Sequence, residues 1–222
     1  MSVGTDVRPS IERADVSSVV VEEVCTPDRR RQHDALDALL AHWDRVAWQP
    51  GLCSLACFAS TMNGSLLTYT QWHTDQALDD YRRRGDDVLR PRWATLGVPG
   101  EPRAYRLYRV ARPVERQVPE PAVGCFPVAT FPMADEATAR GWVDALLDSE
   151  EQNEGTQRAY PGAIAANFHV AVDGRSVFLM SEWHTEAEAV AHIDAVIIPV
   201  LRHLGSGEDA GNRYRFHGGR SR

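Results

Sequence analysis

Hydrophobic residues follow a strand pattern and then a helix pattern in the first part of the chain. Ser18–Cys25 (SVVVEEVC) is rich in β-branched residues and predicts a strand. Pro27 suits the first turn of a helix, and apolar residues recur at helical spacing after it. Pro50 and Gly51 end this helix. Its apolar stripe consists of Leu36, Leu39, Leu40, Trp43 and Val46.

A hairpin and a second helix follow. Cys53–Ala59 and Leu66–Trp72 predict two strands, and the Asn63-Gly64 turn between them is a strong hairpin signal. Thr74 stands where a helix N-cap belongs. The helix after it is expected to carry Leu78, Tyr81, Val88 and Leu89, and the last strand is expected over Arg103–Val110.

The same order recurs later in the chain at one constant offset. The segment Pro50 to Thr74 aligns without a gap with Pro161 to Thr185, and both contain Pro-Gly and Trp-His-Thr. In the second copy, Asp173-Gly174 takes the place of the hairpin turn. Thr185 and Glu188 form a Thr-x-x-Glu capping box. The chain is therefore a tandem repeat, whose second copy ends in a strand over Asn212–His217.

The order strand-helix-strand-strand-helix-strand, found twice, predicts an α+β fold built from two tandem ferredoxin-like βαββαβ units. Each unit covers one sheet face with helices and needs a partner for the other face. We therefore expect an intramolecular pseudo-dimeric α/β barrel. The predicted organisation is an N-terminal arm over 1–17, repeats over 18–111 and 123–217, a proline-rich linker over 112–122, and a C-terminal tail over 218–222.

Composition excludes several kinds of chemistry. The net charge of −7 argues against a general nucleic-acid binder. The sequence contains no lysine, which excludes a Schiff-base, pyridoxal-phosphate or P-loop lysine. No segment is apolar enough to span a membrane or to act as a signal peptide, and the four cysteines are expected to be reduced, so we expect a cytoplasmic protein. No His, Cys, Asp or Glu cluster has metal-ligand spacing, so no metal and no cofactor are expected.

Each copy resembles the antibiotic biosynthesis monooxygenase family at the Trp-His-Thr motif. The segments are Tyr69 to Ala77 (YTQWHTDQA) and Met180 to Ala189 (MSEWHTEAEA), in which a strand ends in Gln-Trp or Glu-Trp and an acidic helix follows. The resemblance covers most of both repeats. It implies the dimeric α/β-barrel fold, whose members include cofactor-independent quinone-forming monooxygenases, haem-degrading enzymes and proteins without known activity.

The resemblance also implies candidate site residues. Quinone-forming members use a Trp here, which matches Trp72 and Trp183. They use an Asn four residues before it, where this chain has Thr68 and Leu179. Their Arg, about one helix beyond, matches Arg92 in the first copy. The second copy has His203 at that spacing and Arg202 beside it, so the first copy retains more of the set.

Other candidates come from the alignment of the two copies. Tyr81 aligns with His192 on the second helix, and either could manage a proton. Asn167 and His169 share one face of a strand and could bind substrate in a cavity. Each has a structural alternative: the Trp residues as core anchors, His192 as a satisfied helical side chain, and the strand residues facing solvent or the pseudo-dimer interface.

The leading hypothesis is a cofactor-independent monooxygenase that oxidises a polycyclic aromatic polyketide, converting an anthrone or phenol to a quinone or hydroxylated product. Its partners would be the small aromatic substrate and O₂, with no nucleic acid and no membrane. A homodimer is left open. The first alternative is a non-enzymatic ligand-binding or accessory barrel of a biosynthetic pathway. A haem-dependent relative with an axial His is the second.

Overall fold

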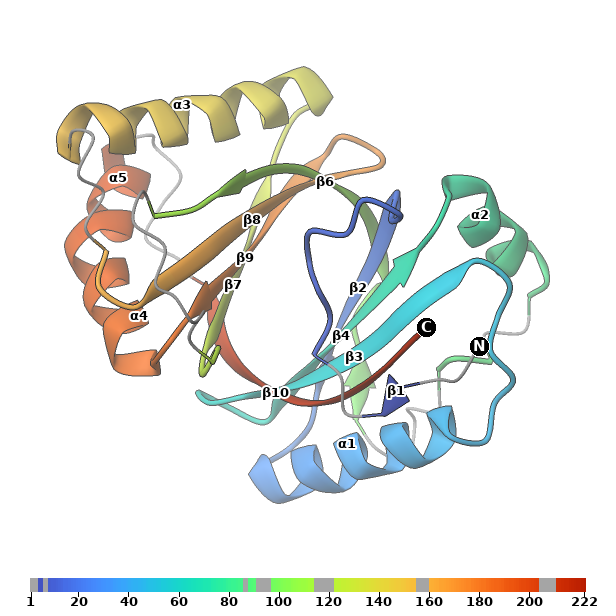
Figure 1. Cartoon of the computed structure of the whole chain (residues 1–222). Coiled ribbons are helices and arrows are strands. Elements are labelled where there is room, and N and C mark those ends of the chain that lie inside the picture. Colours follow the sequence, from blue (N-terminus) through green and yellow to red (C-terminus); the bar gives the residue numbers. More distant parts are fainter. Residues whose placement is uncertain are drawn as a thin grey trace. The chain divides into compact units, whose positions relative to one another are not determined.

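The computed structural model describes residues 4–5, 8–85, 88–90, 97–113, 122–154, 160–203 and 211–222. The chain divides into two compact units. The first unit contains Met1–Arg106 and, from the other end of the chain, Tyr214–Arg222. The second unit contains Leu107–Arg213. Figure 1 shows the helices and strands of both units.

The first unit has an antiparallel sheet that is covered by helices. Its strand order is β1-β10-β3-β4-β2-β6, and β5 also pairs with β2. The elements are β1 (Gly4–Thr5), β2 (Ser18–Cys25), α1 (Arg29–Trp43), β3 (Leu52–Ser60), β4 (Ser65–Trp72), α2 (Asp75–Arg83), β5 (Val98–Pro99), the start of β6 (Arg103–Ala111) and most of β10 (Asn212–Ser221).

The second unit repeats this plan. Its strands β8, β9 and β7 pair antiparallel in that order, and the helices α3, α4 and α5 lie alongside them (Figure 1). The elements are β7 (Phe126–Pro132), α3 (Glu136–Glu154), β8 (Ala163–Ala171), β9 (Ser176–Trp183), α4 (Glu186–His192), a five-residue π-helix (Ile193–Ile197) and α5 (Ile198–His203).

The mixed α+β class and the twice-repeated element order are confirmed. The Thr74 hydroxyl accepts a hydrogen bond from the N–H of Ala77, and the Thr185 hydroxyl accepts one from the N–H of Glu188. Both threonines are therefore N-caps, as the sequence predicts. The first helix is capped by Asp28, whose carboxylate accepts from the N–H of Arg31. Whether the two repeats form an intramolecular pseudo-dimeric barrel stays a prediction.

The helices cover the sheet with apolar side chains in each unit. In the first unit, α1 contributes Leu36 and Leu39, which pack against Leu55 and Leu66 of the sheet. In the second unit, residues of α3 pack against residues of β7, β8 and β9, and all lie in one buried cluster: Phe131, Ala139, Val143, Leu146, Leu147, Phe168, Val170 and Val177.

The second helix of the first repeat is shorter than predicted. It ends at Arg83, before the predicted helical positions Val88 and Leu89. Gly85 has a φ of 74°, a left-handed conformation that glycine adopts without strain and that stops a helix. Leu89 is nevertheless buried, so its hydrophobic side chain indicates the core but not the helix.

The two ends of the chain correct the predicted boundaries. Ile11 is buried and the Gln71 side chain donates to the carbonyl of Ser10, so the predicted arm is in part packed. Gly218 belongs to β10 and not to a tail. A Cβ at Gly218 would come within 2.7 Å of Leu40, which explains the glycine at this close approach. Most of the predicted linker, 114–121, lies outside the described residues.

The compact units also differ from the predicted repeats in their last strands. Tyr214–Arg222 belongs to the first unit, where β10 pairs with β3, and Leu107 onward belongs to the second. A strand pattern in the sequence identifies a strand but not the strand with which it pairs. Among the described residues, no helix combines the length and the apolar character needed to cross a bilayer.

Candidate functional site

Among the described residues, a pocket lies at the junction of the sheet and the second helix in each unit. The pocket of the second unit has a cavity volume of about 80 Å³. Most of its lining is apolar, and its polar residues are few. The lining consists of Ala111, Arg112, Pro113, Pro127, Val128, Ala129, Leu146, Tyr160, Ala163, Ala165, Ala166, Phe168, Leu179, Ser181, Trp183, His192, Ile193 and Ile197.

Three rings lie together in this pocket. The imidazole of His192 stacks on the indole of Trp183, with centroids 5.0 Å apart and planes tilted by 36°. The ring of Tyr160 meets the His192 ring edge-on, with the two centroids 4.3 Å apart. No described residue forms a hydrogen bond with the His192 ring, whose described contacts are these two rings. Aromatic contacts therefore hold the imidazole in the pocket.

Burial sets the charge of His192. Desolvation lowers the pKa of His192 to about 4 from its usual 6.5, because the charged form loses its hydration in apolar surroundings. Near pH 7 the ring is therefore neutral and one nitrogen carries a lone pair. The indole N–H of Trp183 donates to the hydroxyl of Ser181 at 3.3 Å. Among the described residues that line this pocket, Arg112 is the one with a formal charge at neutral pH.

A π-helix positions one wall of the pocket. Ile193–Ile197 forms a π-helix directly after His192, and both Ile193 and Ile197 line the cavity. Because a π-turn adds a residue to the helix, it shifts which side chains face the sheet. Single π-turns inside α-helices occur often at functional sites. Here the irregular turn begins next to the titratable ring.

The pocket of the first unit has the same volume but a different chemistry. It also measures about 80 Å³. Trp72 stacks on Tyr81 with centroids 4.9 Å apart, and the Trp72 N–H donates to the hydroxyl of Thr70 at 3.2 Å. The lining includes Val20, Glu22, Leu39, Trp43, Thr68, Thr70, Trp72, Leu78, Tyr81, Arg82, Leu89, Arg90 and Pro102.

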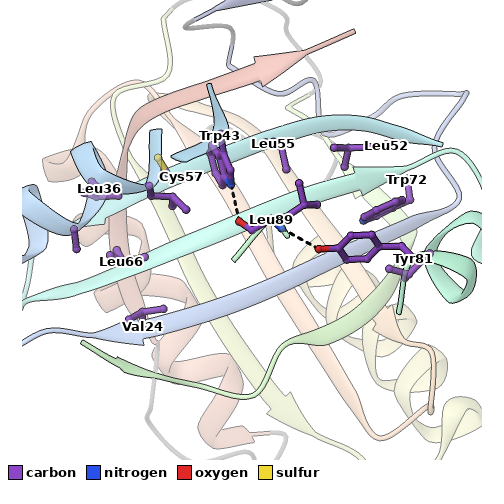
Figure 2. Close-up of a cluster of buried hydrophobic side chains, with 13 residues drawn as sticks. Val24, Leu36, Trp43, Leu52, Leu55, Cys57, Leu66, Trp72, Tyr81 and Leu89 are labelled. Carbon is purple, nitrogen blue, oxygen red and sulfur yellow. Dashed lines mark hydrogen bonds between the residues drawn. The ribbon is translucent and has the colours of Figure 1, made fainter. Parts of the chain in front are cut away.

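The polar groups of this first pocket are engaged with the protein. The Tyr81 hydroxyl accepts the N–H of Leu89 at 3.0 Å, and the Trp43 indole donates to the Leu89 carbonyl at 2.9 Å (Figure 2). The Arg90 guanidinium forms an ion pair with Glu22 through both carboxylate oxygens, with Nε 2.9 Å from Oε2. These contacts fix the segment Val88–Arg90 against the pocket, so we assign them a structural role.

The strand register shows how the two pockets differ. Glu22 pairs with Thr68 on β4. In the second unit, Ala129 pairs with Leu179, and Leu179 aligns with Thr68. Two apolar side chains thus stand where the first unit has a carboxylate and a hydroxyl. The first pocket is therefore the more polar one.

Asn167 and His169 do not line the pocket. They lie on the face of β8 opposite Phe168, which does. Both are fully buried: the Asn167 amide donates to the carbonyl of Met180 at 3.0 Å, and Nδ1 of His169 lies 3.3 Å from the carbonyl of Phe178. They are therefore not part of the lining of this cavity, and their role in substrate binding stays a prediction. Burial lowers the pKa of His169 to about 4.

The structure brings the other predicted residues into two groups. Trp183 and His192 lie together in the second pocket, while Trp72, Tyr81 and Thr68 lie together in the first. Arg92 lies outside the described residues. Sequence reasoning missed Tyr160, Arg112 and Ser181. Alignment of Ser181 with Thr70, both two residues before the Trp, could have indicated the hydroxyl; nothing in the pattern indicated the other two.

Comparison with known proteins shows a shared fold. No protein-family model and no curated protein matches the sequence. A solved structure of an anthrone oxidase-like protein is similar with a TM-score of 0.68 and 16% identity, covering 94% of this chain and 94% of that chain. A monooxygenase candidate from Fusobacterium nucleatum subsp. nucleatum has a TM-score of 0.54 at 8% identity, and the match covers 93% of this chain and 94% of that chain. A second candidate, from Lactobacillus acidophilus, has a TM-score of 0.51 at 7% identity, and the match covers 91% of this chain and 94% of that chain. At such identities the likeness establishes the fold.

Proposed function

We propose that the protein is a cofactor-independent monooxygenase that oxidises a polycyclic aromatic polyketide, and that its active site is the pocket of the second unit. The observation that carries this proposal is the imidazole of His192, which lies in a mostly apolar pocket in contact with the rings of Trp183 and Tyr160. A flat aromatic substrate would find stacking surfaces there, and next to them a proton acceptor.

The chemistry needs little from the protein. His192 would take a proton from an anthrone or phenol, leaving an electron-rich anion. The anion transfers an electron to O₂, and the two radicals combine to a peroxide anion, which takes the proton back from His192 to give a hydroperoxide. Loss of water gives the quinone, so that one CH₂ and one O₂ become one C=O and one H₂O. The pocket has to accept the proton, exclude bulk water and hold the developing negative charge.

The low pKa of His192 makes it a weak base, so the anion itself has to be stabilised. Arg112 supplies a positive charge in the pocket lining, and a cation lowers the free energy of an anion strongly where water is excluded. Once the substrate anion is present, its charge also favours the protonated imidazole. Arg112 and His192 would therefore act on the same developing charge from the pocket wall.

The fold supports the same assignment. The solved anthrone oxidase-like protein shares it over nearly the whole chain. The first unit is proposed to be non-catalytic, because its Tyr81 hydroxyl and its Glu22–Arg90 pair are committed to internal contacts. Trp72, Tyr81 and Thr68 would then maintain the fold of the first repeat. Arg92, which the resemblance implied as a donor, has no part in the mechanism proposed for the second unit.

A second candidate function is a ligand-binding barrel without catalysis. Leu179 favours it, because this side chain lines the pocket at the position where quinone-forming relatives are expected to have a polar side chain. A binder would use the same stacking surfaces and the same apolar lining, but it would not turn its ligand over.

Oxygen uptake separates the two candidates. The purified protein, checked for the absence of a visible chromophore, is mixed with a model anthrone in an oxygen-electrode cell, and quinone formation is followed by absorbance. A monooxygenase consumes one O₂ per quinone formed, at a rate above the uncatalysed oxidation. Saturable quenching of tryptophan fluorescence by the quinone, with no uptake on any anthrone or naphthacenone, would support the binding barrel and refute the enzyme.

A further inference from the structure

Three potential metal ligands meet on the first unit, outside its pocket. One ligand atom from each of Asp15, Cys53 and His73 lies within 4.8 Å of the others. None of the three lines the pocket of this unit. The three residues lie far apart in the sequence, so they form no metal-ligand spacing motif. We propose that Asp15, Cys53 and His73 form a Zn²⁺ site.

The donor set decides which ion fits. A thiolate, an imidazole nitrogen and a carboxylate oxygen are ligands that Zn²⁺ accepts together, usually in tetrahedral geometry, whereas Mg²⁺ and Ca²⁺ prefer oxygen. Three protein ligands leave a fourth position for water. Asp15 and His73 are exposed and Cys53 is buried beneath them, so the ion can enter from the solvent side.

Two of the three ligands already stand at a suitable separation. Nδ1 of His73 lies 3.6 Å from Oδ2 of Asp15. Ligands held at about 2.0–2.3 Å in a tetrahedron lie roughly 3.3–3.8 Å apart, so this pair is already at the required separation. Nδ1 also lies 2.8 Å from the backbone carbonyl of Asp15 and would exchange that contact for the metal. The Cys53 thiol would give up its proton on binding.

Arg13 is the group that could compete with the metal. Its guanidinium holds the Asp15 carboxylate as a fork, with Nε 2.9 Å from Oδ1 and Nη2 2.7 Å from Oδ2. Each carboxylate oxygen has two lone pairs, so the fork leaves one on each oxygen for the ion. Arg13 would then orient the ligand from outside, as carboxylates at metal sites are commonly oriented.

The second repeat provides an internal comparison. There, Nδ1 of His184 lies 3.1 Å from the backbone carbonyl of Ala122, in the same contact that His73 makes with Asp15. Ile164 aligns with Cys53. The His–carbonyl contact therefore belongs to the fold of both copies. In the first copy, the Asp15 carboxylate and the Cys53 thiol lie close to this histidine, so that three potential ligands form a cluster.

Cobalt spectroscopy tests the site without reference to catalysis. Protein freed of metal is titrated with Co²⁺ under argon, and Zn²⁺ is then added. We expect one equivalent of Co²⁺ to produce a thiolate-to-cobalt absorption band in the near ultraviolet, and Zn²⁺ to remove it. Cys53→Ala should abolish the band. Loss of a residue that only orients a metal ligand lowers metal affinity by about 10- to 100-fold. Asp15→Asn changes a ligand itself, so it should lower the affinity by more than this.

Two variants control for adventitious binding. Cys25→Ala removes the exposed cysteine, and His184→Ala removes the histidine that matches His73, so both should retain the band. Circular dichroism establishes that each variant is folded, and Cys53→Ser replaces Cys53→Ala if the latter is not. A parent protein without the band, or a band that persists in the Cys53 variant, would overturn the proposal.

Discussion

The indole of Trp183 stacks on the imidazole of His192 with centroids 5.0 Å apart, and the aligned rings of the first repeat, Trp72 and Tyr81, stack at 4.9 Å. The tilt between the planes is 36° in one pair and 38° in the other. The arrangement is therefore common to both repeats, whereas the chemistry of the second ring is not. The ring that packs on the indole is a phenol in the first repeat, at Tyr81, and an imidazole in the second, at His192.

Replacing His192 by Tyr should therefore preserve the stack and remove the base. We expect His192→Tyr and His192→Gln to lower the rate of anthrone oxidation by about 10²–10⁴, the usual contribution of a general base, with little change in melting temperature. The measurement is oxygen uptake per folded molecule. Tyr81→Phe is the matched control and should retain full turnover. Equal rates in the parent and both His192 variants would exclude His192 as the base.

The sequence predicted the local elements of the fold because local signals determine them. Thr74 and Thr185 cap helices, and the two Trp-His-Thr motifs each follow the same kind of strand, since Trp72 ends β4 and Trp183 ends β9. Side-chain orientation was harder to predict. β8 has a register shift between Ala163 and Ala165, and alternation from the strand alone did not show which face met the helices. Asn167 and His169 were consequently assigned to the cavity, although they face away from it.

The remaining candidate residues come together only in the folded chain, so the sequence pattern did not indicate them. Arg112 was assigned to a linker because prolines surround it, yet it lines the second pocket. Asp15, Cys53 and His73 come from three separate segments, so no spacing rule could group them. The sequence thus singled out Trp183, at the end of β9, and His192, on the helix that follows it, but not the partners that only folding brings to them.

Arg112 should affect substrate binding and anion stabilisation. Arg112→Gln is expected to raise KM and to lower kcat/KM, because the anion would lose the charged group of the lining. Arg112→Lys, which keeps the charge, should recover part of the loss. Steady-state oxygen uptake at several anthrone concentrations measures both constants. Unchanged kcat/KM in Arg112→Gln would mean that the anion is stabilised by another group.

The ion pair of the first pocket should contribute to stability. Glu22 is buried, so Arg90→Met would leave a carboxylate without this partner in apolar surroundings. Breaking a buried pair from one side costs about 3–5 kcal/mol, and because Arg90 is a third exposed we expect the lower end. Urea unfolding measures the loss. Arg83→Met breaks the exposed pair with Asp80 and should cost less than about 1 kcal/mol. Similar losses in the two variants would contradict a structural role for the Glu22 pair.

His169 should make the protein sensitive to acid. Burial holds its pKa at about 4 in the folded chain, against 6.5 in an exposed histidine. Between these values the unfolded chain binds the proton and the folded chain does not, so the free energy of unfolding falls as the pH drops from about 6.5 to about 4. At about 1.4 kcal/mol per pKa unit, this group alone accounts for a loss of about 3 kcal/mol. His192 adds a loss of the same sign over the same range.

His169→Phe introduces the residue that the first repeat has at Phe58, and it should flatten the pH dependence while His192→Phe flattens the remainder. Urea unfolding at pH 7, 6, 5 and 4 measures both slopes, and a parent protein whose stability is constant over this range would show that these imidazoles are protonated at little cost in the folded state.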